Sequence, residues 1–336
     1  MKATFLNPGK LFTILDIDNP KISSNELLLK VESCAICGSD LKIAKYGNSR
    51  INSKRIIGHE ISGTVKEIGS DVSNFKIGDK VAIGADLPCH DCEECKVGNV
   101  NNCNTNLALG YQFDGGFAEN IILNEHVLRG GPIQRFQNSS FDLACLAEPL
   151  ACAINGVEKS LNCHSMGAKK KTLIFGGGPM GIMIAEYLKF LGFNDIFISE
   201  PNEFRLKFID SKTNFKIFDK SLDTKFDLIF TACPVIESHI QSLKLIAKSG
   251  VVNFFGGLPE SSKDLSLSSN FVHYNEIVIT GSHGSNPIHH KKALDLLEGK
   301  LIDIEYLITH RYNLDQINDA FVMASSGKAQ KIIIKP

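Results

Sequence analysis

Hydrophobic and polar residues alternate over short stretches in the first third of the chain, and glycines interrupt the pattern. Alternating stretches occupy residues 26–31, 61–68 and 80–83, with turn-forming residues at 69–71 and 78–79 between them. Period-two alternation bounded by turn residues is typical of strands with one buried face. The pattern therefore predicts a compact all-β module at the start of the chain.

From about Glu148 the pattern changes to longer apolar stretches with helical spacing, separated by short apolar runs. We expect helices at residues 150–159 and 179–191 and strands at 172–175, 196–199, 226–230 and 251–255. Strands that alternate with helices indicate a parallel sheet with crossover connections. The middle of the chain is therefore predicted to form a separate α/β domain.

Two segments depart from this alternation. Residues 218–225 are the only link between two expected strands, whereas a parallel crossover normally needs a dozen or more residues. We expect a truncated crossover there, with part of the sheet face less well covered. The last fifty residues hold a helix at 288–298 and a terminal strand at 331–336, too little to bury a core alone. This tail is predicted to return to the first module.

A glycine-rich segment follows the expected strand 172–175 and opens the next helix. Gly176, Gly178, Pro179, Met180 and Gly181 belong to a G-x-G-x-x-G pattern. In this context glycines let the backbone turn tightly and approach a pyrophosphate, and the helix N-terminus presents free N–H groups to the anion. Proline suits the first helical turn, where its missing N–H costs little. The segment predicts a dinucleotide site.

The choice between NAD and NADP depends on a residue at the end of the following strand. Glu200 lies there, nineteen residues beyond Gly181. Its carboxylate is expected to accept hydrogen bonds from the ribose hydroxyls and to repel a 2′-phosphate, which favours NAD. Arg205 weakens the preference for NAD, because its guanidinium could turn toward a phosphate.

Four cysteines are bunched within fifteen residues. Cys89, Cys92, Cys95 and Cys103 have the spacing C-x-x-C-x-x-C-x7-C. Four thiolates satisfy tetrahedral zinc without an open position, so the predicted zinc is structural. Iron–sulfur clusters use similar spacings, but the neighbouring dinucleotide motif argues against them. His90 is interpreted as an exposed loop residue rather than a ligand.

A second set of donors lies on two turns marked by glycine. Cys37-Gly38-Ser39-Asp40 and Gly58-His59-Glu60 are about twenty residues apart. A thiolate, an imidazole and a carboxylate suit a catalytic zinc with one position left for water or substrate. Taken singly, Cys37 is a small buried residue and His59 a turn residue. Beside a zinc loop and a dinucleotide motif, they predict a catalytic centre.

These motifs together resemble the medium-chain zinc-dependent dehydrogenases, in particular the sorbitol/iditol and threonine dehydrogenase branch. The resemblance covers essentially the whole chain and is specific to the superfamily rather than to one substrate. Besides the motifs above, it rests on Gly115-Gly116-Phe117-Ala118-Glu119, Glu148-Pro149-Leu150 and Phe254-Phe255-Gly256-Gly257-Leu258-Pro259.

The resemblance implies an α/β protein in which a Rossmann domain, a doubly wound parallel sheet, is inserted into a GroES-like β domain. The implied boundaries are 1–149 with 287–336 for the zinc domain and 150–286 for the NAD-binding domain. By position, Cys37, His59 and Glu60 match zinc ligands. Glu148 matches a residue that supplies another ligand or holds the zinc-bound water. Two zinc ions per chain and NAD are the implied cofactors.

The family chemistry implies that zinc stabilises the alkoxide of a secondary alcohol while hydride leaves for the nicotinamide. Ser39 resembles the hydroxyl that begins proton removal. Many relatives carry a relay histidine five residues after the cysteine ligand, but here Lys42 stands at that position. Lys42 would relay protons only with a lowered pKa, so a route through the cofactor ribose to water is an equal alternative.

The substrate loop departs from the animal sorbitol dehydrogenases, which carry an Arg-Tyr pair there. The corresponding residues 281–286 contain neither, and His283 is interpreted as a structural loop residue rather than a substrate ligand. We expect a small polyhydroxylated substrate. The alternatives are an aminocyclitol, a sugar alcohol phosphate or an amino-alcohol such as threonine, and a non-catalytic protein that binds zinc and a dinucleotide.

Composition excludes several other classes of function. The net charge of −1 and the lack of a basic stripe argue against nucleic-acid binding, and Lys169-Lys170-Lys171 is read as a solvated turn. No apolar run is long enough for a membrane helix, and the first residues do not resemble a signal peptide. We expect a soluble cytoplasmic enzyme. The family resemblance implies a homodimer or homotetramer.

The remaining cysteines are expected to be free thiols, because disulfides seldom persist in a reducing compartment. Free cysteine usually behaves as a small buried hydrophobic residue. We expect reduced, mostly buried side chains at Cys34, Cys145, Cys152, Cys163 and Cys233.

Overall fold

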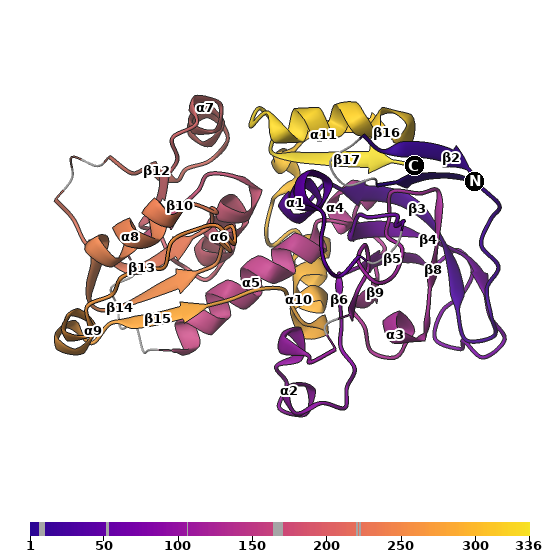
Figure 1. The fold of residues 1–336 in the computed structure, drawn as a ribbon, viewed down its shortest axis with the longest axis horizontal. Helices are drawn as coiled ribbons and strands as arrows, with labels where there is room; N and C mark the ends of the chain where they lie inside the picture. The colour runs from indigo at the N-terminus through magenta and orange to yellow at the C-terminus, as the bar shows by residue number, and fades with distance from the viewer. Residues whose placement is uncertain (7–10, 52–53, 106, 164–170, 220, 222) are drawn as a thin grey trace. The chain divides into compact units, whose positions relative to one another are not determined.

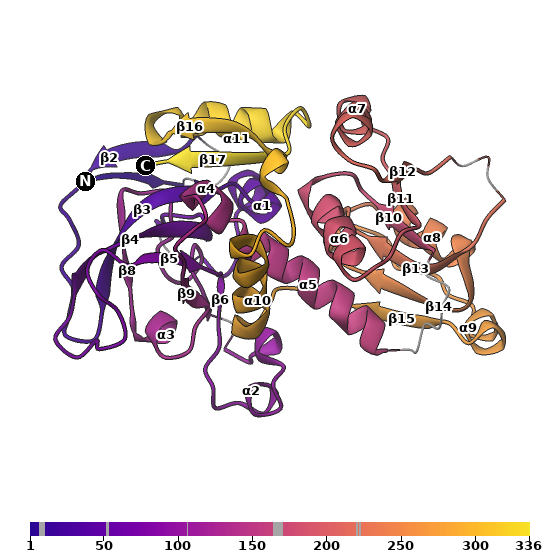
Figure 2. The same cartoon turned by 180° about the vertical axis from the view of Figure 1, so that it is seen from behind.

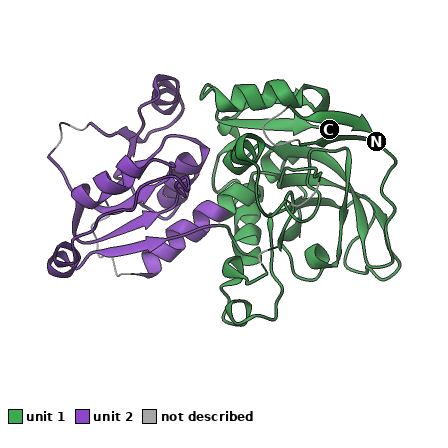
Figure 3. Ribbon diagram, viewed as in Figure 1, with its two compact units in different colours: residues 1–151, 284–336 green, residues 152–283 purple. Residues whose placement is uncertain are grey.

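The computed structural model describes residues 1–6, 11–51, 54–105, 107–163, 171–219, 221 and 223–336 (Figures 1 and 2). The chain forms two compact units, one made of residues 1–151 with 284–336 and the other of residues 152–283 (Figure 3). Lys169 and Lys170 lie outside the described residues. Among the described helices, none is both long and apolar enough to cross a membrane.

The first unit is built around a seven-stranded sheet. Its order is β16 (Ile308–Asn313), β17 (Lys331–Lys335), β3 (Leu27–Ala35), β4 (Glu60–Ile68), β5 (Lys80–Ile83) and β9 (Ile133–Arg135), with β8 (Asn120–Leu123) also paired to β3. The expected strands 26–31, 61–68 and 80–83 are confirmed as parts of β3, β4 and β5. Because β17 pairs antiparallel with β3, the tail returns to the first module as predicted.

Shorter elements surround this sheet (Figure 1). They are β1 (Lys2–Phe5), β2 (Thr13–Asp16), α1 (Gly38–Tyr46), β6 (Asp86–Leu87), α2 (Glu93–Lys96), η1 (Val100–Asn102), β7 (Leu107–Ala108), α3 (Glu125–Leu128), α4 (Phe141–Ala144), α10 (Pro287–Glu298), η2 (Glu305–Leu307), η3 (Leu314–Gln316) and α11 (Ile317–Ser325). The start of α5 (Ala147–Asn162) also belongs to this unit. The fully buried Phe117 anchors the core and meets Phe12 and Phe321 edge-on.

The second unit contains a six-stranded parallel sheet. Its order is β12 (Lys216–Ile217), β11 (Ile196–Ser199), β10 (Thr172–Phe175), β13 (Phe226–Thr231), β14 (Ile246–Phe254) and β15 (Val278–Gly281). The helices are α6 (Pro179–Phe190), α7 (Glu203–Lys212), α8 (Ile236–Leu245) and α9 (Ser269–Asn275). The strand order reverses between β10 and β13, which is the doubly wound arrangement expected from the sequence.

The elements of the second unit follow the expected pattern closely. Strand β14 begins at Ile246, five residues earlier than expected, because the alternation of apolar residues is weak before Val251. Between β12 and β13 the described residues contain no helix, so the expected shortening of this crossover is confirmed. Edge strand β12 has only two residues, and both are exposed.

A histidine without hydrogen bonds is enclosed in the first unit. His290, on α10, has no exposed surface, and neither of its ring nitrogens has a hydrogen-bond partner among the described residues. Its ring packs so closely on Gly84 that a Cβ there would lie 3.1 Å from His290 Cδ2. Burial therefore lowers the pKa of His290 to about 4, because an imidazolium would lose its hydration without gaining a partner.

We predict that His290 makes the fold less stable in mild acid. Unfolded histidine takes up a proton below about pH 6.5, whereas folded His290 stays neutral until about pH 4. The free energy of unfolding should therefore fall by about 2 kcal/mol between pH 7.5 and pH 5 from this group alone. His290→Leu should remove that part of the pH dependence, measured by urea unfolding. His273→Leu, at an exposed position, is the matched control. An unchanged pH dependence in His290→Leu would contradict the assignment.

Candidate functional site

Strand pairing brings together the donors of the two glycine-marked turns. Strand β3 ends at Ala35 and β4 begins at Glu60, and these two residues are partners in the antiparallel register. Cys37 therefore lies just beyond the end of β3, beside the start of β4. One ligand atom from each of Cys37, His59 and Glu60 lies within 4.8 Å of the others.

The turn before β4 depends on Gly58. This residue has φ +95°, and a Cβ at this position would lie 2.8 Å from Cys34 Sγ and 3.0 Å from the Phe117 ring. Only glycine fits such a backbone and such close packing. The turn therefore directs His59 inward, where 4 % of its surface is exposed, and Glu60 is fully buried.

Asp40 lies behind His59. It is the last residue of the motif that begins at Cys37, but it was not predicted to be a functional residue. Its Oδ1 lies 3.4 Å from His59 Nδ1, and its Oδ2 accepts a hydrogen bond from the Cys37 backbone N–H at 2.9 Å. A carboxylate behind an imidazole orients the ring of a metal-ligating histidine. Burial opposes the charged ring, but Asp40 and Cys37 outweigh it and raise the pKa of His59 well above its usual range.

Glu60 is paired with a lysine from the far end of the chain. Both Glu60 oxygens accept hydrogen bonds from Lys331 Nζ, and both side chains are almost fully buried. Lys331 starts β17, and the β17–β3 pairing places it beside Ile36. Burial alone would lower the pKa of Lys331, but the nearby Glu60 and Cys37 outweigh burial and raise this pKa. The sequence signal for this pair was a lysine at the start of an apolar strand.

Glu148 and Ser39 flank the donor group. Glu148, in the first turn of α5, is 5 % exposed and interacts electrostatically with His59 and Glu60, outside the three residues whose ligand atoms meet. Burial raises the pKa of Glu148 to about 8. Ser39 Oγ lies 3.4 Å from His59 Nε2. A hydroxyl therefore lies beside the imidazole.

Tyr111 is a further neighbour that no sequence motif singled out. The centroids of the Tyr111 and His59 rings are 6.0 Å apart. Burial raises the pKa of Tyr111, so the phenol is neutral. No spacing rule connects residues 59 and 111, and only the folded chain brings them together.

The four cysteines converge as predicted. Their sulfur atoms lie within 4.8 Å of one another, with 3.9 Å between the sulfurs of Cys89 and Cys95 and 4.0 Å between those of Cys92 and Cys103. Two sulfurs at about 2.3 Å from one tetrahedral zinc are about 3.8 Å apart, so the cluster has the size that zinc requires. His90 is exposed and outside the cluster.

The thiols of this cluster differ in acidity without a cation. Backbone N–H groups of Asn104 and Cys95 lower the pKa of Cys92, whereas desolvation and the Cys92 thiol raise the pKa of Cys95 to about 12. Close thiolates repel one another, so they cannot all ionise together unless a cation compensates them. The donor set and its electrostatics both fit a divalent metal.

The glycine loop of the second unit has the compact form that its motif requires. Gly176, with φ +107°, directly follows β10, and Gly178 caps α6 ahead of Pro179. A Cβ on Gly181 would lie 1.9 Å from Gly176 O, so only glycine lets the helix start so close to the turn. Met180 follows Pro179 in the first turn of α6. The loop lies beside the strand-order switch, where such sheets bind ligands.

Glu200 and Arg205 both lie next to this loop. Glu200 Oε2 accepts a hydrogen bond from the Gly177 N–H at 2.7 Å, and its Oε1 accepts one from the Asn202 N–H at 2.8 Å. Arg205 Nη1 lies 3.8 Å from Glu200 Oε2 and faces Gly178. A carboxylate has about four acceptor sites, so Glu200 retains capacity for ribose hydroxyls.

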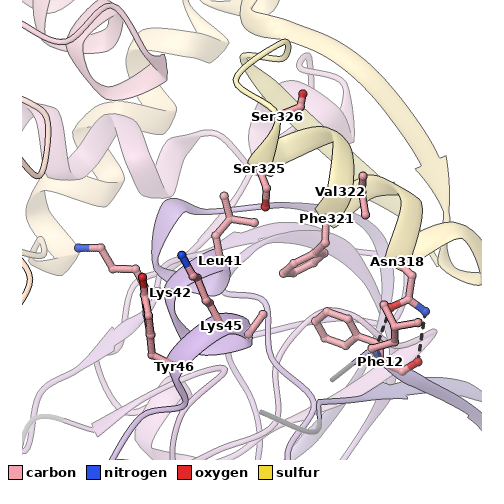
Figure 4. Close-up of a pocket in the computed structure, with 12 residues that line it drawn as sticks. Phe12, Leu41, Lys42, Lys45, Tyr46, Asn318, Phe321, Val322, Ser325 and Ser326 are labelled. Carbon is pink, nitrogen blue, oxygen red and sulfur yellow. Dashed lines mark hydrogen bonds between the residues drawn. The ribbon is translucent and has the colours of Figure 1, made fainter. Parts of the chain in front are cut away.

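Lys42 lies on the wall of a groove within the first unit. Helices α1 and α11 border this groove, whose volume is about 1010 Å³, and Figure 4 shows Lys42 and Lys45 extending from α1. Phe12 and Phe321 form its apolar floor. His283 is exposed, and its backbone oxygen accepts a hydrogen bond from Asn155.

All ten cysteines are free thiols. The expectation that the five outside the two clusters are mostly buried is only partly met. Cys34 and Cys145 are buried, Cys152 and Cys233 are half-buried, and Cys163 is exposed near the end of α5. The polar end of that helix leaves Cys163 with a surface position.

Two family models match the chain. The model of the alcohol dehydrogenase GroES-like domain matches residues 23–131, and the model of the glucose dehydrogenase C-terminus matches residues 141–334. The second match alone covers more than half of the chain.

Individual relatives align over most of their length. The chain is 29 % identical to L-threonine 3-dehydrogenase of Pseudoalteromonas translucida, covering 97 % of this chain and 96 % of the relative. It is 29 % identical to D-altritol 5-dehydrogenase of Agrobacterium fabrum, with 90 % and 89 % covered. The crystal structure of a zinc-binding dehydrogenase from Sinorhizobium meliloti bound to NADP superposes with a TM-score of 0.89 at 25 % identity, covering 100 % and 99 %.

We predict that the buried pair of Glu60 and Lys331 is strongly coupled. Lys331→Met leaves the Glu60 carboxylate buried without its cation, which should lower the free energy of unfolding by about 3–5 kcal/mol. Glu60→Gln combined with Lys331→Met should recover most of that loss. Lys335→Met, on the same strand with a half-exposed side chain, should cost about 1 kcal/mol or less. Urea unfolding checks all three, and equal losses for the two single variants would refute the coupling.

Proposed function

Because this chain belongs to the medium-chain zinc-dependent dehydrogenases, we propose that it oxidises a secondary alcohol of a small polyhydroxylated substrate and passes the hydride to NAD. The observation that carries the proposal is the meeting of Cys37, His59 and Glu60 within 4.8 Å beside the Ser39 hydroxyl. A structural metal site needs no such hydroxyl, whereas an alcohol dehydrogenase needs a proton acceptor at the metal.

Each residue of the centre has a proposed role. Cys37 and His59 are the principal zinc ligands, with Glu60 or Glu148 completing the set, and the bound zinc supplies Lewis-acid stabilisation of the substrate alkoxide. Asp40 holds the His59 ring in position. Ser39 takes over the proton of the substrate hydroxyl and passes its own onward, either to Lys42 or through the cofactor ribose to water.

Lys331 has a second proposed role in the choice of ligand. Its ammonium holds both Glu60 oxygens, so Lys331 would compete with a metal for the Glu60 carboxylate. Glu148, which burial keeps protonated near neutral pH, gives up a proton when it binds a cation. Binding of a metal would therefore cost free energy at either carboxylate, which is why Cys37 and His59 are proposed as the principal ligands.

The four-cysteine cluster is proposed to hold the second zinc. Cys89, Cys92, Cys95 and Cys103 fill all four positions of a tetrahedral ion, so this zinc closes its loop and takes no part in the reaction.

For the cofactor, we propose that Gly176, Gly178, Pro179, Met180 and Gly181 present the pyrophosphate site and that Glu200 selects NAD. The S. meliloti relative binds NADP, and in this chain Arg205 is the residue that could bind the 2′-phosphate of NADP. In this chain Arg205 lies near Glu200, whose carboxylate competes with any phosphate for the guanidinium.

A second class of substrate is compatible with the same reaction. L-threonine 3-dehydrogenases are among the similar proteins, which favours an amino-alcohol substrate, whereas the altritol dehydrogenase favours a polyol. The remaining alternative is a non-catalytic protein, which would bind zinc and the dinucleotide but would not reduce NAD. A cytoplasmic location is proposed from the sequence, and a homodimer or homotetramer is proposed from the family.

We predict that Cys37→Ser abolishes turnover without unfolding the protein. Loss of the thiolate should lower the zinc content from two ions per chain to one and reduce kcat/KM for secondary alcohols by at least about 100-fold. Elemental analysis and NADH absorbance measure the two effects. Cys163→Ser, at the exposed cysteine, is the matched control and should retain both zinc ions and activity. Full activity in Cys37→Ser would exclude the proposed centre.

The cofactor preference is predicted to reside in Glu200. Glu200→Ala removes the repulsion of a 2′-phosphate and frees Arg205, so the ratio of kcat/KM for NAD to that for NADP should fall at least about tenfold. Glu203→Ala, at the exposed start of α7, should leave the ratio unchanged. Should wild-type protein already prefer NADP, the assignment of Glu200 is wrong.

A further inference from the structure

A buried histidine in the second unit joins the ends of two neighbouring strands. His239 lies in α8 with 5 % of its surface exposed. Its Nε2 shares a hydrogen bond of 3.1 Å with Thr231 Oγ1. Its ring stacks on Phe254 with 4.3 Å between the centroids and 12° between the planes. Because Thr231 is the last residue of β13 and Phe254 the last of β14, one side chain contacts both strand ends.

The end of β13 forms one wall of the proposed dinucleotide site. Phe175 and Thr231 are partners in the parallel register of β10 and β13, the two strands between which the strand order reverses. The Ala232 N–H donates to Phe175 O at 2.8 Å. A Cβ on Gly176 would lie 2.9 Å from Ala232 O and 3.3 Å from Cys233 Cβ. The glycine loop therefore packs directly on the segment that follows β13, at the crevice where sheets of this type bind ligands.

The end of β14 supports this wall from the other side of β13. The Gly256 N–H donates to Thr231 O at 2.6 Å, which continues the pairing of β13 and β14 beyond Asn253. A Cβ on Gly256 would lie 2.8 Å from Cys233 O, so the two segments are in close contact. A displacement of either strand end would therefore be transmitted to the residues that pack against the glycine loop.

His239 meets two separate requirements at this place. Thr231 has no exposed surface, so its hydroxyl needs a hydrogen-bond partner inside the protein. Burial lowers the pKa of His239, so its ring is neutral near pH 7 and can stack on Phe254 without burying a charge. The hydrogen bond fixes a direction within the ring plane, and the stack fixes the plane itself. The ring is therefore held in one orientation between the two strand ends.

We propose that His239 is a positioning residue for the dinucleotide, which acts by holding the ends of β13 and β14 in the shape that the cofactor requires. The inference rests on the proposed function, because it assumes that NAD binds at the glycine loop. All the contacts that carry it lie within the second unit. Loss of His239 should therefore weaken cofactor binding and leave both zinc sites of the first unit unchanged.

Two substitutions separate the hydrogen bond from the stack. His239→Phe keeps a flat ring on Phe254 but leaves the Thr231 hydroxyl without this partner, so the Kd for NADH should rise about tenfold. His239→Gln carries an amide nitrogen as many bonds from Cβ as Nε2, so its Kd should stay within about threefold of wild type. His273→Phe, at an exposed position of α9, is the matched control and should bind NADH like wild type.

A variant of the other partner tests the same hydrogen bond. Thr231→Val removes the hydroxyl with little change in volume and should raise the Kd about as much as His239→Phe. The double variant with both changes should bind NADH no more weakly than either single variant, because the bond is already lost. Independent effects would instead multiply and raise the Kd about 100-fold.

The Kd is measured by NADH fluorescence on the zinc-loaded whole chain, and it needs no turnover. Zinc content and melting temperature show whether each variant is folded, and Thr231→Val decides should His239→Phe fail to fold. An unchanged Kd in His239→Phe, an equal rise in His239→Gln, or effects that multiply in the double variant would overturn the inference and leave the proposed function intact. Wild-type protein that binds neither NADH nor NADPH would overturn both.

Discussion

The register between β3 and β4 is the constraint on which the centre depends. Pairing of Ala35 with Glu60 places the turn after β3 against the turn before β4, so that Cys37 and His59 meet although twenty-two positions separate them. A slip of one residue would turn every side chain of the strand to the opposite face of the sheet. The β17–β3 pairing adds Lys331 to the same place and thereby compensates the buried charge of Glu60.

The centre combines ionisable groups whose charges are compensated by a partner or removed by a bound proton. His59 has a raised pKa, Glu148 is neutral near pH 7 because of burial, and Glu60 is neutralised by Lys331. A metal ion that displaces protons from these groups would stabilise the folded unit by its binding free energy. The four-cysteine cluster follows the same principle with thiols alone, and its full coordination removes any position for substrate.

The sequence predicted the features that short-range patterns encode. The strands of the second unit, the glycine loop and the four-cysteine cluster follow from local spacing, because each is made by residues close together in the chain. The role of Asp40 could have been predicted, since this residue lies three positions after Cys37. Lys331 and Tyr111 were not predicted, because their places in the site arise from strand pairing and from a loop packed against the Gly58 turn. Buried polar partners of this kind depend on contacts that are distant in sequence, which no periodicity reports.

The proposed centre requires a single zinc ion between the Cys37 sulfur and the His59 ring. Anomalous scattering from crystals of metal-replete protein, recorded on both sides of the zinc absorption edge, tests this directly. We expect two peaks per chain, one among the four clustered cysteines and one within bonding distance of Cys37 Sγ and a His59 ring nitrogen. A peak at the four-cysteine cluster alone, with none at Cys37 and His59, would contradict it.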